Sequence, residues 1–122
     1  PLDETPPFGA LTGLALAVWV IMRVIGTSIL VPIVEELMFR SYLLEKIAPQ
    51  GTSILRVAVA VSLTTLLFAA LHDRWIAAAV AGLIFSLLAL RSRNITDAIL
   101  SHAVANFGVA LWALMTGAWH IL

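Results

Sequence analysis

Apolar residues fill most of this chain in long runs that short polar stretches interrupt. Uncharged runs cover residues 8–22, 57–71 and 75–90, and further apolar segments follow Arg23 and Thr96. Several positions in a row are apolar within these runs, whereas transmembrane β-strands alternate polar and apolar residues. A helix needs about 20 predominantly apolar residues to cross a bilayer. The pattern therefore predicts an all-α, polytopic bundle of about five transmembrane helices.

Turn-forming residues set the expected ends of these helices. We expect the first span to end near Arg23 to Gly26 and a second helix to begin near Pro32, because proline suits a first helical turn. Residues 49–51 supply a turn, and Thr52 or Ser53 is expected to cap the helix that follows. The second helix is expected to run to about Ile47 and the fifth from Asp97 to about Trp119. The third helix carries the apolar run 57–71, and the fourth carries the uncharged run 75–90.

The N-terminal residues 1–7 differ from the rest of the chain. They are polar and rich in proline, with two acids and no base. We interpret residues 1–7 as a polar N-terminal tail or the cut edge of a longer protein, and residues 8–122 as a single intramembrane domain.

Composition supports a membrane protein and excludes several other classes. Hydrophobic residues make up 61% of the chain and charged residues 11%, against about 25% charged in a soluble domain. The mean hydropathy is +1.04. Seven basic and seven acidic residues leave no net charge, so no basic field attracts nucleic acid. Without cysteine there is neither a disulfide framework nor a thiolate metal site.

Ionisable residues inside the apolar runs are the informative ones, because a charge at the bilayer centre costs at least about 2.5 to 3.5 kcal/mol. Glu36 and Arg40 are four residues apart in the order that favours a helical ion pair. Glu35 is rotated by about 100° from Glu36. We therefore expect Glu35 to remain an unpaired acid that faces the bundle.

Two histidines and an amide complete a candidate catalytic set. His102 and Asn106 are four apart and share one helix face, and His72 follows the third apolar run. In one mechanism Glu35 and His72 take a proton from water while His102 and Asn106 donate to the oxyanion. In the other, Glu35, His72 and His102 bind a divalent metal such as zinc. The metal-free mechanism is favoured because the chain has no HExxH.

Three ordered motifs resemble those of the CAAX-protease and bacteriocin-processing (ABI, CPBP) family of intramembrane endopeptidases. EExxxR begins at Glu35, FxxxH at Phe68 and HxxxN at His102, and the resemblance extends over residues 23–109. Residues 23–44 also resemble the exosortase-associated branch of that family, which implies a bacterial inner membrane. The resemblance implies that Glu35 is the base and that His72 shares its water. It places His102 and Asn106 on the oxyanion side, and it makes Glu36, Arg40 and Phe68 supporting residues.

These motifs predict a protease that cleaves a membrane-associated protein or peptide without a covalent acyl-enzyme. The mechanism requires His72 to lie within about 10 Å of Glu35 or His102, although helices of full length would place the two histidines toward opposite sides of the membrane. The turn at 91–96 must then dip into the bundle, or the fourth helix must be short or tilted. The alternatives are a non-enzymatic scaffold or immunity protein with a structural polar core, and a proton or ion pathway. The sequence does not specify an oligomeric state.

Overall fold

The structure is a computed structural model that describes residues 11–122. The predicted polar tail over residues 1–7 lies outside the described residues. All regular structure in residues 11–122 is helical, which confirms the all-α prediction. In chain order the elements are α1 (Gly13–Ile25), η1 (Gly26–Leu30), α2 (Val31–Glu36), η2 (Leu37–Leu44), α3 (Glu45–Ile47), α4 (Ile54–Ala70), α5 (Trp75–Ser92), α6 (Ile95–Thr116) and η3 (Trp119–Ile121).

The first two predicted helices are one helical run, and the break expected near Arg23 is absent. Elements α1 to α3 follow one another without interruption over Gly13–Ile47. Pro32 lies inside this run, where its ring crowds the carbonyl four residues earlier and its N–H is missing. The preceding segment η1 is a π-helix, and such a wider turn accommodates proline in a membrane helix. The prediction was wrong because proline was assigned to a helix start.

The connection between α3 and α4 follows the expected turn chemistry. Ser53 caps α4, because its side-chain oxygen accepts a hydrogen bond from the Arg56 backbone N–H at 3.3 Å. The Arg56 side chain in turn donates from Nε to the Ile47 carbonyl at 2.6 Å, and so satisfies one of the orphan carbonyls at the end of α3. Helix α4 begins at Ile54, three residues earlier than the apolar pattern suggested.

The chain divides into two compact units. One consists of the described residues up to Pro32 together with Ala103–Leu122, and the other is Ile33–His102. The boundaries fall within continuous helices, after Pro32 and after His102. The assignment of residues 8–122 to a single domain stays a prediction.

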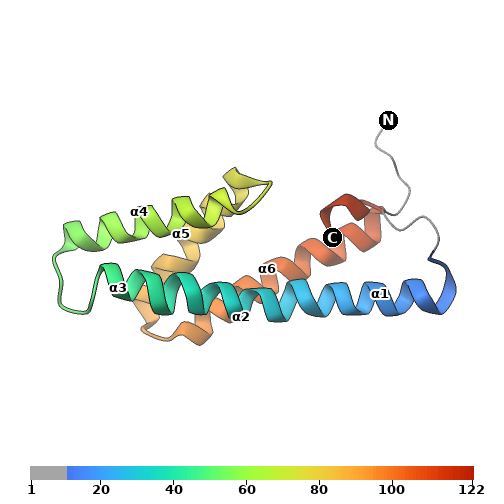
Figure 1. Ribbon diagram of the computed structural model, residues 1–122, viewed down its shortest axis with the longest axis horizontal. Coiled ribbons are helices and arrows are strands. Elements are labelled where there is room, and N and C mark those ends of the chain that lie inside the picture. The colour runs from blue at the N-terminus through green and yellow to red at the C-terminus, as the bar shows by residue number, and fades with distance from the viewer. Residues whose placement is uncertain (1–10) are drawn as a thin grey trace. The chain divides into compact units, whose positions relative to one another are not determined.

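Antiparallel packing within the unit Ile33–His102 sets the level of the candidate residues. Helix α4 doubles back along η2 and α3 (Figure 1). The Phe39 and Phe68 rings meet edge to face with centroids 5.4 Å apart, and nearer the turn Leu44 packs with Val61. His72 lies one turn after Phe68, and Glu35 lies one turn before Phe39. In an antiparallel pair these two steps lead in the same direction, so His72 reaches the level of Glu35.

The distribution of polar and apolar side chains suits a lipid environment. Three helical segments are long and apolar enough to cross a membrane, namely Gly13–Ile47, Trp75–Ser92 and Ile95–Thr116, and α4 is a shorter apolar helix. Large apolar side chains such as Leu66 and Val80 are exposed, whereas Glu36 and Ser86 are buried. This arrangement is that of an integral membrane protein, because lipid tails solvate exposed apolar side chains.

Candidate active site

A buried ion pair forms the centre of the polar cluster. Arg40 Nη1 donates to Glu36 Oε1 at 3.1 Å, and both side chains are fully buried. The helical spacing of four residues brings the two groups together, as the sequence predicted. Removing either partner would leave an uncompensated buried charge, so each residue depends on the other.

Arg40 also joins the η2 segment to α5. Its Nη2 donates to the Gly82 carbonyl at 2.8 Å, and its Nε donates to Ser86 Oγ at 3.3 Å. The guanidinium lies 4.6 Å from the Phe68 ring centroid, within the range of a cation–π contact. A Cβ at Gly82 would lie 3.0 Å from Phe68 Cδ1 and 3.2 Å from Arg40 Nη2. Glycine at this position therefore permits the close approach of α5.

Glu36 holds His102 as well as Arg40, which the sequence did not reveal. His102 Nδ1 and Glu36 Oε1 are 2.9 Å apart, and the His102 side chain is 4% exposed. A carboxylate accepts only, so His102 Nδ1 carries the proton of this hydrogen bond. The residues are 66 positions apart, and helical spacing alone gave no signal for the contact. The signal present was a histidine inside an apolar run, because such a group requires a polar partner.

His72 is oriented in a similar way by a backbone acceptor. Its Nδ1 donates to the Phe68 carbonyl at 2.7 Å, and its ring lies 4.5 Å from the Phe68 ring, centroid to centroid. A carbonyl oxygen accepts only, so Nδ1 is the protonated nitrogen. When His72 is neutral, its Nε2 therefore presents a lone pair. The FxxxH spacing supplies both the carbonyl and the ring that fix this histidine.

Both imidazole Nε2 atoms approach the same oxygen of Glu35. The distance to Glu35 Oε2 is 3.9 Å from His72 and 3.7 Å from His102. These distances exceed those of direct hydrogen bonds, and Glu35 Oε2 is buried without a hydrogen-bond partner. With both histidines neutral, three acceptors face one point. A water molecule bound at that point could donate to two of the three, the carboxylate and one imidazole.

A carboxylate oxygen and two imidazole Nε2 atoms could also act as ligands of a metal ion. Among residues 11–122, no group of three His, Cys, Asp or Glu side chains has an arrangement that fits a metal ion. The predicted ligands Glu35, His72 and His102 therefore do not form a ready three-ligand site in this conformation.

Two phenylalanines enclose His102. The Phe85 ring stacks on the imidazole with centroids 4.7 Å apart and an interplanar angle of 20°, and Phe68 meets it edge to face at 5.7 Å. These contacts limit rotation of the imidazole and keep its Nε2 directed at Glu35. Phe85 lies in an apolar run without a neighbouring motif, so the sequence did not single it out.

Asn106 lies in the other unit, and its side chain has a partner there. Its Nδ2 donates to the Thr27 carbonyl at 2.8 Å. The structure thus brings together Glu35, His72, His102, Glu36, Arg40 and Phe68 within the unit Ile33–His102. The oxyanion role of Asn106 stays a prediction.

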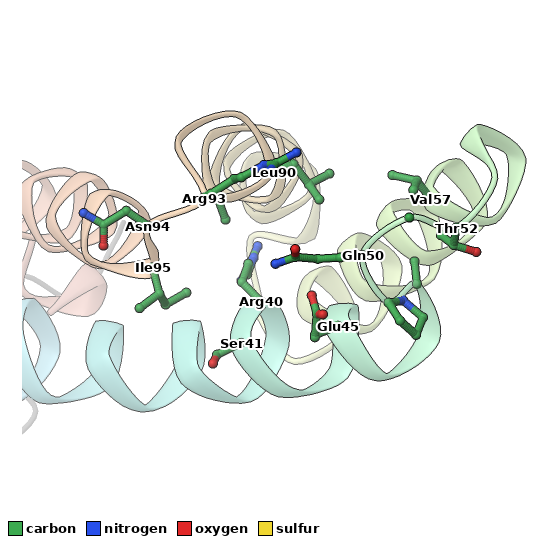
Figure 2. Close-up of a pocket in the computed structure, with 14 residues that line it drawn as sticks. Arg40, Ser41, Glu45, Gln50, Thr52, Val57, Leu90, Arg93, Asn94 and Ile95 are labelled. Atoms are coloured by element: carbon green, nitrogen blue, oxygen red, sulfur yellow. The ribbon is translucent and has the colours of Figure 1, made fainter.

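A polar cavity lies within the unit Ile33–His102 and reaches Arg40. Its volume is about 420 Å³, and its walls include Arg40 and Ser41 from η2, Gln50 from the turn, and Arg93 to Ile95. In Figure 2 Ile95 lies between Asn94 and the helix that carries Ser41. Residues 91–94 of the turn after α5 are exposed, so the dip of this turn into the bundle stays a prediction.

Comparison with known proteins assigns the family. No curated protein and no solved structure matches the chain. The family model described as type II CAAX prenyl endopeptidase Rce1-like matches residues 17–108. The match covers more than half of the chain and includes every candidate residue from Glu35 to Asn106. The chain therefore belongs to the type II CAAX prenyl endopeptidase Rce1-like family.

Proposed function

We propose that this protein is an intramembrane endopeptidase in which Glu35, His72 and His102 activate a water molecule. Membership of the family implies endopeptidase activity. The observation that carries the finer proposal is the convergence of two imidazole Nε2 atoms on the unpartnered Glu35 Oε2, at 3.9 and 3.7 Å. A water bound there would donate one O–H to the carboxylate and the other to an imidazole.

Each group has a distinct part in the proposed reaction. Glu35 acts as the general base and takes a proton from the water, whose oxygen then attacks the carbonyl carbon of the scissile peptide. In the reactive form His102 carries a proton on each ring nitrogen throughout, so that Nδ1–H donates to the Glu36 carboxylate, which stabilises the ring's positive charge, and Nε2–H donates to the oxyanion. The C–N bond then breaks and the leaving amine receives the proton that Glu35 took. The intermediate is a tetrahedral adduct of water, so no acyl-enzyme forms.

The substrate is a membrane-associated protein or peptide. The family description contains the words CAAX prenyl endopeptidase, so we take a prenylated C-terminus as the first candidate substrate. The exosortase-like segment at residues 23–44 supports a bacterial inner membrane as the location. A precursor with a sorting signal or a leader peptide fits that location as an alternative substrate.

The decisive variant is Glu35→Gln in the full chain reconstituted in proteoliposomes. The probes are a fluorescence-quenched farnesylated peptide ending in a CAAX sequence, the same peptide without the farnesyl group, and peptide mapping of co-reconstituted membrane proteins. We expect the wild type to cleave and Glu35→Gln to lose about 10³-fold or more in rate, with unchanged thermal unfolding in detergent. Glu45→Gln is the matched control, because Glu45 lies ten residues after Glu35 on the same helical run and is at the wall of the cavity rather than beside the two imidazoles, and it should retain activity.

Full activity in Glu35→Gln would overturn the mechanism. If the wild type cleaves nothing in the peptide mapping, the scaffold alternative is favoured. A chelator titration with metal analysis tests the cofactor separately. Activity that disappears with chelator and returns with zinc would replace the metal-free mechanism by metal-assisted hydrolysis.

A further inference from the structure

The Thr27 carbonyl lacks the donors that a helix normally offers. Thr27 belongs to the π-helical segment η1, in which the Val31 backbone N–H donates to the Gly26 carbonyl. The residue five positions after Thr27 is Pro32, which has no N–H. The donors four and five residues ahead of Thr27 are therefore engaged or missing. Pro32 is itself fully buried.

An unsatisfied carbonyl is costly in an apolar environment. In hydrocarbon each unsatisfied backbone group costs several kcal/mol, because no water is available to replace the lost hydrogen bond. The Thr27 hydroxyl donates to the Arg23 carbonyl at 2.9 Å, so it is engaged elsewhere. Asn106 Nδ2 donates to the Thr27 carbonyl at 2.8 Å and supplies the missing hydrogen bond from another helix.

We propose that Asn106 is a positioning residue whose carboxamide replaces the backbone donor that Pro32 lacks. The hydrogen bond stabilises the π-helical turn next to Pro32, and Glu35 follows three residues later on the same helical run. Asn106 thus fixes the backbone that leads to the proposed base. In this role one N–H of the Asn106 carboxamide is engaged by the Thr27 carbonyl. The activity measurements, but not the stability measurements, rest on the proposed function.

A double-mutant cycle of Asn106→Ala and Pro32→Ala tests this role. Pro32→Ala provides an N–H at position 32, so the segment can adopt regular α-helical hydrogen bonds in which the Thr27 carbonyl no longer needs Asn106. In the wild-type background we expect Asn106→Ala to lower the Tm by several degrees and the cleavage rate by about 10-fold or more. In the Pro32→Ala background the same substitution should change the rate by less than about 3-fold and leave the Tm nearly unchanged.

The competing role predicts a different result. If Asn106 donates to the oxyanion, Asn106→Ala lowers kcat equally in both backgrounds and leaves the Tm unchanged in each, which would overturn the proposal. Asn106→Asp is the second variant, since a carboxylate of the same shape has no N–H to donate. It should behave like Asn106→Ala and be rescued by Pro32→Ala. Should the wild type show no cleavage, the Tm cycle still decides the role of Asn106, and only the proposed function fails.

Discussion

Two adjacent carboxylates in this protein have different environments because of where the helix directs them. Glu36 Oε1 accepts from both Arg40 and His102, and the residue is completely buried. Glu35 keeps a buried oxygen without a hydrogen-bond partner beside two imidazoles. Glu36 Oε2 is likewise buried without a hydrogen-bond partner, but the Nε2 atoms of both imidazoles approach Glu35. This difference in position is why Glu35 is the proposed base.

The contributions of Glu36 to stability and to catalysis can be separated by substituting Arg40 alone and then together with Glu36. Arg40→Met leaves the buried Glu36 carboxylate without its cation, so we expect a loss of about 3 to 5 kcal/mol in unfolding free energy. The double variant Glu36→Gln/Arg40→Met removes both buried charges and should recover most of that stability. Its cleavage rate should remain about 10²-fold or more below the wild type, because His102 no longer has a charged partner.

Unfolding in detergent and kcat on the cleaved peptide are the two measurements. Glu45→Gln again serves as the control for removal of an acid from the same helical run. A double variant with wild-type activity would show that Glu36 serves only as the counter-ion of Arg40.

The site residues differ in how far the sequence could predict their contacts. The Glu36–Arg40 pair depends only on helical spacing, so the sequence predicted it. The 2.9 Å contact of Glu36 with His102 depends on the packing of elements 66 residues apart. The tautomer of His72 depends on a carbonyl that becomes available because α4 ends at Ala70. These contacts follow from tertiary packing, which composition and spacing do not specify.

At the level of elements, the approach of α5 depends on the absence of a side chain at Gly82. Its carbonyl accepts from Arg40, and the space above its Cα is occupied by Phe68 and by the Arg40 guanidinium. The hydrogen-bonded centre thus requires α5 to approach α4 and η2 closely. Glycine in a helix interior normally costs about 0.5 to 1 kcal/mol relative to alanine, and here the cost is offset by these contacts.

Gly82→Ala is expected to destabilise the protein by about 1 to 3 kcal/mol, because the added Cβ must displace the Phe68 ring or the guanidinium. Activity should fall with it, since Phe68 contacts both candidate histidines. Gly108→Ala is the matched control on α6, where an added Cβ meets nothing within 4 Å. It should leave stability unchanged or raise it slightly. Equal effects of the two substitutions on thermal unfolding would contradict this account of α5.

Helix limits were predictable where turn residues mark them and not where proline is ambiguous. Ser53 and the turn before it correctly located the start of α4 within a few residues. Pro32 was assigned to a helix start, yet it lies within Gly13–Ile47 behind a π-helical segment. A proline at a first turn and a proline after a π-bulge look the same in one sequence. The difference is a hydrogen bond from a distant residue, here Asn106 to Thr27.

At the scale of the whole molecule, the distribution of polar and apolar side chains suits a protein surrounded by lipid. Exposed side chains along the helices are largely apolar, whereas buried positions include Glu36, Arg40 and His102. The family match confirms the resemblance that the three motifs suggested. Long apolar runs and ordered motifs are readable in a sequence because they do not depend on the details of packing. The substrate is not encoded in those features.

Membrane topology follows from α5 and from the cavity that joins two turns. Trp75–Ser92 is long and apolar enough to span a membrane, so we predict that Arg74 and Asn94 lie on opposite sides of it. Gln50 and Asn94 line the same cavity, so their turns lie on the same side.

The chain has no cysteine, and single-cysteine variants therefore report each position without background. A membrane-impermeant maleimide should label Gln50→Cys and Asn94→Cys from one side of sealed proteoliposomes and Arg74→Cys only from the other. Val80→Cys, exposed in the middle of α5, should react only after solubilisation in denaturing detergent, because lipid covers it in the bilayer. Labelling of Arg74→Cys and Asn94→Cys from the same side would show that α5 does not cross the membrane.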